Sequence, residues 1–147
     1  MDGAARIVAI ARDWIGTPYR HQASVKGAGC DCLGLVRGVW REMRGDEPEV
    51  PPAYSMDWSE PQREERLWAA AGRHLCPVPD GPARAGEVVL FRMRAGSVAK
   101  HLGIVSAVGR APRFIHAYAR HGVIESPLST PWARRIVARF QFPEEVG

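Results

Sequence analysis

Two cysteines separated by one aspartate stand at the start of an apolar stretch of this chain, at Cys30, Asp31 and Cys32. Thiols in such a pattern form a disulfide, bind a metal ion or act as a nucleophile. The third cysteine, Cys76, leaves an odd number, and Cys30 and Cys32 are too close in sequence to bridge easily. A disulfide framework is therefore not expected, whereas the metal and nucleophile interpretations stay open.

Cys32 is better placed than Cys30 for nucleophilic chemistry. A cysteine attacks as the thiolate, so a catalytic thiol needs a lowered pKa. From Asp31 onward apolar residues recur at helical spacing, and Asp31 is suited to cap the helix. Cys32 would then lie in the first turn, where the helix dipole favours a thiolate and free backbone N–H groups can hold an oxyanion. Cys30 precedes the helix and has no clear role beyond packing or a redox liability.

Two histidines are candidates for the base that takes the thiol proton. His101 opens the run HLGIVSAV, whose alternate residues share one face of a strand, and His116 lies in the next run, RFIHAYA. If these strands pair as an antiparallel hairpin, the two imidazoles lie side by side and one can orient the other. The glycine at position 103 leaves room beside His101. His121 is an equally capable third member on composition alone.

A zinc site is the competing interpretation. Cys30, Cys32, His101 and His116 supply two thiolates and two imidazoles, which make a legitimate tetrahedral set. Structural zinc sites, however, usually separate paired cysteines by about two to four residues, and here one residue separates them. We therefore expect no metal and no cofactor, although near-stoichiometric zinc in the purified protein would overturn this expectation.

The elements that position these residues change from helical to strand-like along the chain. Apolar side chains at three- and four-residue spacing predict helices over residues 2–15, 31–45 and about 60–74, with Pro61 early in the last. β-rich runs split by Gly and Pro turns predict strands over residues 87–93, 101–108, 113–119 and 135–142. Helices followed by strands predict an α+β fold, with N-terminal helices packed on a C-terminal antiparallel sheet.

The chain has the size and composition of one soluble globular domain. We expect its 147 residues, of which 46% are hydrophobic, to form a single domain over residues 1–147. The net charge of +4 suits an anionic partner, but only weakly. Charged side chains interrupt the first apolar segment at Asp2, Arg6, Arg12 and Asp13, so we expect neither a signal peptide nor a membrane span.

Five motifs follow one another between about Gly16 and Ala117: GTPYRHQ, GAGCDCLGLV, RAGEVVLF, AKHLGIV and RFIHA. In this order they resemble the motifs of the NlpC/P60 cysteine peptidases. Asp-Cys-x-Gly before an apolar helix, combined with His-x-Gly-Ile-Val, is a fairly specific pattern. The resemblance implies a papain-like fold and cleavage of peptide bonds in bacterial cell-wall stem peptides.

Carried over to this chain, the resemblance implies that Cys32 is the nucleophile and His101 the base. His116 would orient His101, which completes a Cys-His-His triad. Tyr19 of the GTPY stretch would be a pocket residue near the thiol, and we place Tyr19 and Asp31 on the substrate and oxyanion side of the site.

Two positions depart from the family pattern. Leu33 stands where many members have serine, which puts one polar substrate contact in doubt but not the nucleophile. Glu87 replaces the usual aspartate of the "GD" turn, a conservative change away from the chemistry.

The activity implied by the resemblance is hydrolysis of the stem-peptide bond between D-glutamate and the diamino acid of peptidoglycan. The GCDCLG form without a secretion signal looks closest to the phage tail and gene-transfer-agent branch. We therefore expect synthesis in the cytoplasm without a signal peptide, association with a virion or tail, and action in the periplasm or cell wall. The expected partners are stem peptides and phage-like tail proteins, with neither nucleic acid nor a membrane span.

Other functions stay open on the sequence. The acyltransferase relatives of this fold also use a thioester, but their permuted, lipid-modifying branch places histidine before cysteine, and here cysteine comes first. A non-catalytic wall-binding or tail-assembly module is a further alternative. The complete Cys/His/His set argues against it, because a binding module has no use for an activated thiol.

Overall fold

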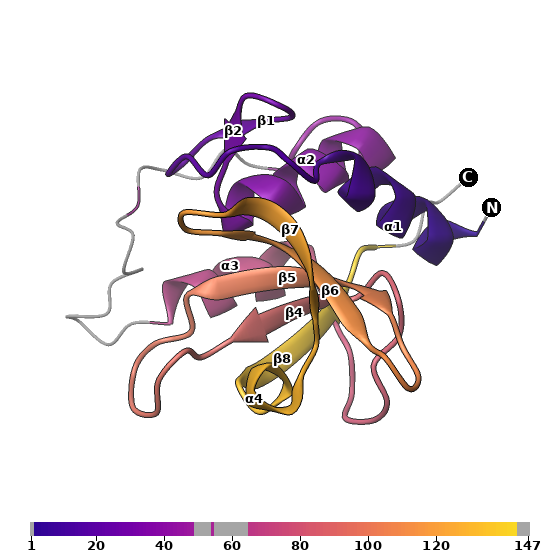
Figure 1. The fold of residues 1–147 in the computed structure, drawn as a ribbon, viewed down its shortest axis with the longest axis vertical. Coiled ribbons are helices and arrows are strands. Elements are labelled where there is room, and N and C mark those ends of the chain that lie inside the picture. The colour runs from indigo at the N-terminus through magenta and orange to yellow at the C-terminus, as the bar shows by residue number, and fades with distance from the viewer. Residues whose placement is uncertain (1, 49–53, 55–64, 144–147) are drawn as a thin grey trace.

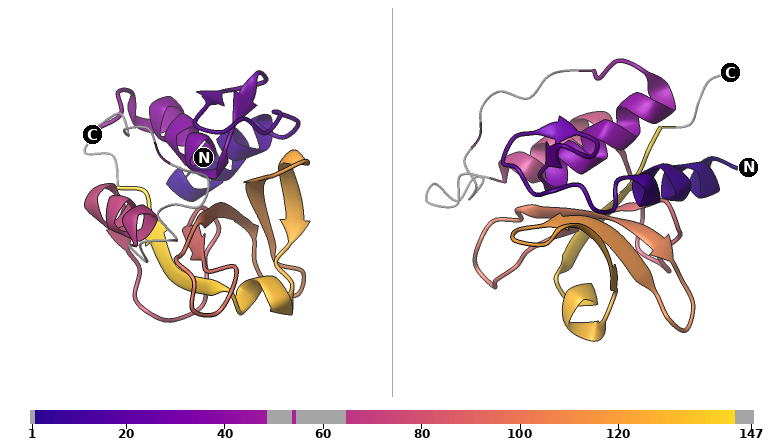
Figure 2. Two further views of the ribbon diagram at one scale, coloured as in Figure 1. Left: turned by 90° about the vertical axis from the view of Figure 1, so that its left-hand side faces the viewer. Right: turned by 45° about the horizontal axis from the view of Figure 1, so that its top comes forward.

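Helices cover one face of a six-stranded antiparallel sheet in the computed structural model, which describes residues 2–48, 54 and 65–143 (Figure 1). These helices are α1 (Gly3–Asp13), α2 (Cys32–Arg44) and α3 (Arg66–His74), while the short α4 (Thr130–Ala133) lies on the other side of the sheet (Figure 2). The strands of the sheet, in spatial order, are β3 (Cys76–Pro77), β8 (Ile136–Gln141), β4 (Val88–Phe91), β5 (His101–Ala107), β6 (Arg113–Tyr118) and β7 (Gly122–Pro127). A small hairpin of β1 (Ser24–Val25) and β2 (Gly29–Cys30) lies between α1 and α2 in the chain. The predicted α+β class is confirmed.

The first two helices begin and end close to where the sequence predicts. The Asp2 carboxylate accepts a hydrogen bond from the Ala5 N–H at 2.7 Å and caps α1. Asp31 caps α2 in the same way, and Gly45 ends it with a φ of +88°, which a glycine adopts without strain. None of the helices in the described ranges has the length and apolar character needed to cross a membrane.

The third helix differs from the prediction at its start. The structure describes it from Arg66, and Glu65 before it has a non-helical backbone. The Glu65 carboxylate accepts hydrogen bonds from the Ala99 N–H at 2.9 Å and from the Arg92 guanidinium at 3.1 Å. These contacts tie the residue to the segment before β5, so a continuous helix through position 65 is wrong. The predicted start over residues 60–64, Pro61 included, lies outside the described residues.

The four predicted strands are present, and the sheet contains two strands more. β7 pairs with β6 over six residues, although its sequence GVIESP contains glycine, glutamate, serine and proline, which are depleted in strands. β3 adds a short edge strand of two residues next to β8. Both strands form because they pair with neighbouring strands, and the local sequence pattern gives no information about that pairing.

Both faces of β5 are buried, and its alternate residues face different cores. Leu102 and Ile104 pack with Leu35 and Val39 of α2 in the core below the helices. Val105 packs on the opposite face in a smaller cluster with side chains of the neighbouring strands, and Trp132 of α4 packs against that cluster. Figure 2 shows the helical layer on one side of the curved sheet and α4 on the other. His101 shares the Val105 face at the end of the strand that lies nearest the start of α2.

Candidate active site

Cys32 is the first residue of α2, and its thiol lies against the backbone on either side of His101. The residue is 6% exposed, and Sγ donates a long hydrogen bond of 3.8 Å to the carbonyl oxygen of Lys100. Backbone N–H groups of Leu33 and Leu102 hydrogen-bond to the sulfur and favour its thiolate. The position at the helix start is therefore as predicted, and α2 and β5 together hold the thiol.

The Asp31 carboxylate fixes the start of α2 and the loop before it. This residue is 2% exposed, and its Oδ1 accepts the Gly34 N–H at 2.7 Å. Its Oδ2 accepts the Gln22 N–H at 2.7 Å and the phenolic hydrogen of Tyr54. The carbonyl of Tyr54 in turn accepts hydrogen bonds from the side chains of His21 and Gln22, at 2.8 and 2.7 Å. Since three donors fill the Asp31 carboxylate, it orders the backbone around Cys32.

The two predicted histidines lie side by side on β5 and β6. These strands pair antiparallel, with Ile104 opposite Ile115, as the hairpin prediction requires. His101 Nε2 and His116 Nδ1 are 2.8 Å apart, and the two residues are 8% and 1% exposed. The pair is thus hydrogen-bonded and almost fully enclosed.

The room at Gly103 is used by an aromatic ring. A Cβ atom at this position would lie 2.7 Å from Cδ2 of Phe114, and the Phe114 ring lies 4.2 Å from the ring of His116. The glycine thus leaves space for Phe114, which packs on His116. His121, the alternative third member, stacks instead on Tyr118 with ring centroids 5.5 Å apart. The structure therefore brings His116, and not His121, to hydrogen-bonding distance of His101.

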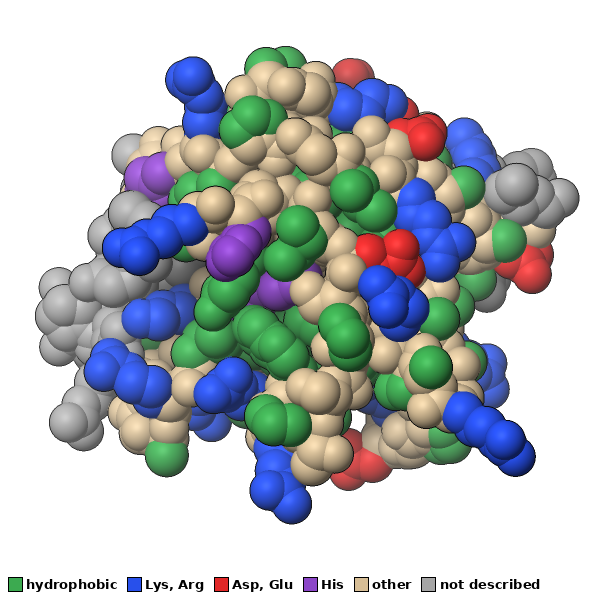
Figure 3. Space-filling view, in the orientation of Figure 1, with side chains coloured by type: hydrophobic (Ala, Val, Ile, Leu, Met, Phe, Trp, Pro, Cys, Tyr) green, Lys and Arg blue, Asp and Glu red, His purple; other side chains and the backbone are tan. Residues whose placement is uncertain are grey.

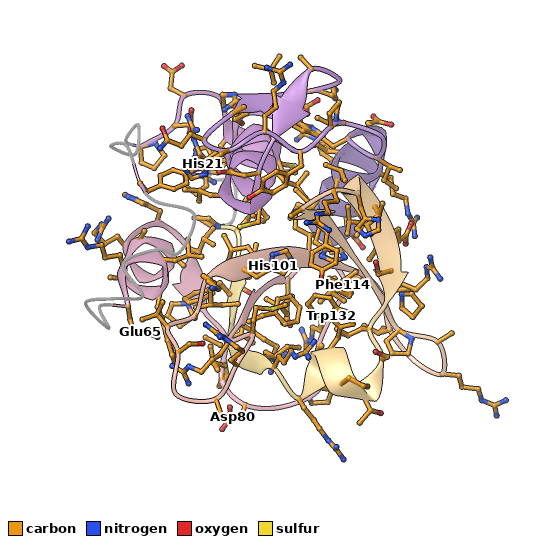
Figure 4. The ribbon with its side chains drawn as sticks, turned by 60° about the vertical axis from the view of Figure 1, so that its left-hand side comes forward. His21, Glu65, Asp80, His101, Phe114 and Trp132 are labelled. Carbon is orange, nitrogen blue, oxygen red and sulfur yellow. The ribbon has the colours of Figure 1, made fainter. Side chains whose placement is uncertain are left out.

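Aromatic rings surround the His101 imidazole. Its ring centroid lies 5.6 Å from Phe91, 5.7 Å from Trp132 and 5.8 Å from Tyr118. Figure 4 shows His101 between the part of the chain that carries His21 and the rings of Phe114 and Trp132. This apolar surrounding favours the neutral imidazole.

Cys32 and His101 line the same pocket, which has a volume of about 180 Å³. The other residues that line it are Tyr19, His21, Asp31, Met93, Lys100, Ala117, Tyr118 and Ala119. On the face shown in Figure 3, histidine side chains lie among hydrophobic ones, with Lys and Arg side chains around them. The predicted residues Tyr19 and Asp31 are thus brought to the pocket of the thiol and the imidazole.

The protonation of the resting site differs from the prediction. Burial, followed by the charge of Asp31, raises the pKa of the Cys32 thiol from 9.0 to about 12. The N–H groups of Leu33 and Leu102 act in the predicted direction, but the loss of hydration at the buried thiol outweighs them. Burial, then His116, lowers the pKa of His101 to about 3. The resting pair is a neutral thiol and a neutral imidazole, so the expected lowered thiol pKa is wrong for this state.

Tyr19 stays protonated beside the thiol. Burial, followed by repulsion from the thiolate form of Cys32 and from the Asp31 carboxylate, raises the pKa of its phenol to about 12. A neutral phenol is a hydrogen-bond donor at neutral pH, whereas a carboxylate only accepts. Of the two residues that the sequence places on the oxyanion side, Tyr19 therefore has the chemistry to stabilise negative charge, and Asp31 does not.

The zinc interpretation finds no geometric support in residues 2–48, 54 and 65–143. Within these residues, no three His, Cys, Asp or Glu side chains are arranged to hold a metal ion. Cys30 is fully buried at the end of β2, where its backbone N–H bonds to Pro18 at 3.0 Å. The two imidazoles form a hydrogen bond with each other, which uses one nitrogen of each ring.

The sequence analysis did not identify several residues that contact the site, and Tyr54, Ser126 and Lys100 are three of them. Tyr54 binds the cap of α2 from a proline-rich segment that carries no signal for it. Ser126 lies 2.9 Å from His116 on β7, a strand that was not predicted. Lys100 was passed over because it precedes the predicted strand, although its place next to His101 in the AKHLGIV motif is a usable signal.

Comparison with known proteins decides the family. The model of the NlpC/P60 family matches residues 16–140. The chain belongs to the NlpC/P60 family. It is 32% identical over 123 residues to the gamma-DL-glutamyl hydrolase of Bacillus subtilis (strain 168), an alignment that covers 84% of this chain. The chain spans 25% of the length of that relative.

Solved structures of NlpC/P60 proteins share the fold. The NlpC/p60 domain of the peptidoglycan hydrolase SagA superposes with a TM-score of 0.62 at 22% identity, covering 96% of this chain and 100% of that domain. An NlpC/P60 family protein from Bacillus cereus ATCC 10987 gives a TM-score of 0.66 at 19% identity, covering 96% of this chain and 40% of that protein. The expected NlpC/P60 fold is thereby confirmed.

Proposed function

We propose that this NlpC/P60 protein is a cysteine endopeptidase that hydrolyses a stem-peptide amide bond of peptidoglycan. One observation carries the proposal: Cys32 and His101 line one pocket, and His116 Nδ1 lies 2.8 Å from Nε2 of His101. The family supports the substrate class, since a structural neighbour is named as a peptidoglycan hydrolase and a relative as a gamma-DL-glutamyl hydrolase. The bond cleaved is that between D-glutamate and the diamino acid.

Proton transfer accompanies the attack in this mechanism, because the resting thiol and imidazole are both neutral. His101 Nε2 is used by His116, so Nδ1 is the nitrogen left to receive the thiol proton. As the Cys32 sulfur bonds to the substrate carbonyl carbon, its proton passes to His101 Nδ1. Backbone N–H groups at the start of α2, with the neutral phenol of Tyr19, stabilise the oxyanion that forms.

The same imidazole completes the reaction. His101 gives its proton to the leaving amine of the diamino acid as the C–N bond breaks, which leaves a thioester between D-glutamate and Cys32. His101 then takes a proton from water, whose oxygen attacks the thioester. The C–S bond breaks, the thiol regains its proton, and D-glutamate carries a free carboxylate. His116 holds the ring of His101 in place through each step.

Delivery by a phage-like tail is a second part of the proposal. It rests on the GCDCLG form of the nucleophile motif, which looks closest to the phage tail and gene-transfer-agent branch of the family. Mass spectrometry of tail particles purified from the producing strain tests this part separately. Peptides of this chain at a fixed ratio to tail proteins support tail delivery, and their absence from the particles overturns it.

Digestion of purified peptidoglycan, followed by mass spectrometry of the muropeptides, tests the enzymatic activity. The wild-type protein should release fragments with a new amino terminus at the diamino acid. Cys32→Ala should release none, while Cys76→Ala, which changes an exposed cysteine on β3, should match the wild type. Release by Cys32→Ala would assign the reaction to another nucleophile, and no release by the wild type would overturn the proposed function.

A further inference from the structure

The hydrogen bonds of the histidine pair continue to a third strand. His116 Nε2 lies 2.9 Å from Oγ of Ser126, while His116 Nδ1 faces His101 Nε2 at 2.8 Å. Ser126 belongs to β7, where it is paired with Phe114 of β6. Both ring nitrogens of His116 are therefore in use, and the serine hydroxyl ends the chain of contacts that begins at His101.

The positions of the hydrogens determine whether each group in this series of hydrogen bonds donates or accepts. A neutral imidazole has one N–H and one bare nitrogen. His101 can take the thiol proton only on a bare Nδ1, so its own hydrogen must be on Nε2, where it is donated to His116 Nδ1. His116 must then carry its hydrogen on Nε2, and that hydrogen requires an acceptor. The acceptor within reach is Ser126 Oγ.

We infer that Ser126 is a positioning residue, whose hydroxyl accepts the Nε2–H of His116 and thereby keeps Nδ1 of His101 free to act as the base. This inference rests on the proposed function and deepens it, because it extends the site from three side chains to four. The reverse proton order, with Ser126 donating to His116, places a hydrogen on His101 Nδ1 and removes the base. A hydroxyl can serve as acceptor here, which an apolar side chain cannot.

The imidazolium that forms on His101 during the attack also requires Ser126 to accept the Nε2–H of His116. When His101 carries both hydrogens, it can donate to His116 only if His116 Nδ1 is bare, and His116 Nε2–H then again needs Ser126 as acceptor. Burial and the neighbouring His121 lower the pKa of His116 to about 4, so its ring is neutral and able to accept at neutral pH. The ion on His101 is thus stabilised through two successive hydrogen bonds.

Around His116, Ser126 supplies the hydrogen bond to the ring nitrogen Nε2. The Phe114 and Trp132 rings lie 4.2 and 5.2 Å from the His116 ring and carry no acceptor for the Nε2–H. The Tyr118 ring also stacks on His116, with ring centroids 5.3 Å apart, but the atom at hydrogen-bonding distance from Nε2 is Ser126 Oγ. His116 is 1% exposed, so bulk water has little access to the nitrogen. Without the hydroxyl, a buried N–H is left without a partner, and the other tautomer becomes competitive.

Nitrogen-15 NMR of the histidine rings tests the inference without any substrate. In the wild type, His101 and His116 should both show the hydrogen on Nε2. Ser126→Ala should shift His116 toward the Nδ1–H form and His101 with it, whereas Ser126→Thr, which keeps a hydroxyl, should restore the wild-type spectrum. The control is Ser106→Ala, because the Ser106 hydroxyl binds Glu125 at 2.6 Å and not a histidine. Unchanged tautomers in Ser126→Ala would overturn the inference, even if activity fell.

Kinetics on a soluble muropeptide supply the second readout. Ser126→Ala should lower kcat about tenfold with KM changed less than about twofold, which is the scale of one hydrogen bond. Ser126→Thr should recover most of the rate, and the thermal unfolding midpoints of both variants should stay near that of the wild type. A loss of rate that Thr does not restore would overturn the inference. If the wild type cleaves no muropeptide, the proposed function fails, while the NMR experiment still decides the role of Ser126.

Discussion

Tyr54 donates its phenolic hydrogen to Asp31, the residue that caps the helix of Cys32. Burial, then this hydrogen bond and the Asp31 charge, raises the pKa of Tyr54, so the phenol stays protonated and remains a donor. The thiol therefore depends on a residue that follows the end of its own helix. The contact links the segment before α3 to the loop before α2 through a single buried carboxylate.

Replacing Tyr54 with phenylalanine should weaken this support and keep the ring. The Asp31 carboxylate would lose one of its three donors, and a buried charged acceptor without its partner costs about 1–3 kcal/mol in the free energy of unfolding. Urea denaturation measures the loss. The proposed peptidase activity should fall as well, because the first turn of α2 is less firmly held. An unfolding free energy equal to that of the wild type would show that water replaces the phenol at no cost.

Gly34 should be the least replaceable glycine of α2. A Cβ atom at this position would lie 1.9 Å from the backbone oxygen of Ala23, an atom that cannot rotate away. Gly34→Ala should therefore displace the loop before α2, lower the thermal midpoint, and cost about 2 kcal/mol or more in the free energy of unfolding. The crowding lies within one turn of Cys32, so activity should fall with stability.

Gly72 of α3 provides the matched control for Gly34. Nothing lies within 4 Å of a Cβ atom built there. Alanine is a better helix former than glycine, so Gly72→Ala should raise the free energy of unfolding by about 0.5–1 kcal/mol. A stability loss of equal size in both variants would mean that the crowding at Ala23 is not what makes Gly34 necessary.

The parts of the fold that the sequence predicts are those with local causes. Asp2 and Asp31 cap helices through atoms three residues away, and the β-branched runs of the central strands carry their own pattern. β7 escaped because its six residues become a strand only by pairing with β6. The start of the third helix was misplaced because Glu65 binds Ala99, a contact across 34 residues that no window of sequence contains.

The site residues also fall into two groups: those that the local sequence predicts and those that reach the site through tertiary contacts. Strand period and antiparallel pairing predict that His101 and His116 are neighbours, and the structure places their nitrogens 2.8 Å apart. Tyr54 and Ser126 reach the site through tertiary contacts alone, so residue type and spacing do not reveal them. The thiol pKa was predicted from the helix start, but burial also acts on it, and burial is a property of the packed molecule.

Alanine substitution should separate the roles of His116 and His121. His116 binds His101, so His116→Ala leaves the proposed base unoriented and should lower kcat by about a hundredfold or more while a residual rate remains. His121 is exposed and stacks on Tyr118, so His121→Ala should change kcat less than about threefold. Steady-state rates on one muropeptide measure both variants. The opposite order of losses would identify His121 as the third member.

Alkylation of Cys32 by iodoacetamide should be slow at neutral pH and should rise steadily with pH. The thiolate is the reactive form, and a pKa raised from 9.0 to about 12 means that its fraction grows about tenfold per pH unit until the pH approaches 12. Since the shift is upward, the rate constant should show no plateau between pH 6 and 9. Peptide mass spectrometry follows each cysteine separately, and Cys76, which is exposed on β3, provides an internal reference in the same sample. A plateau in the Cys32 rate constant below pH 8 would instead show a thiolate–imidazolium pair in the resting enzyme, and the attack would then begin from an ion pair with no proton transfer at that step.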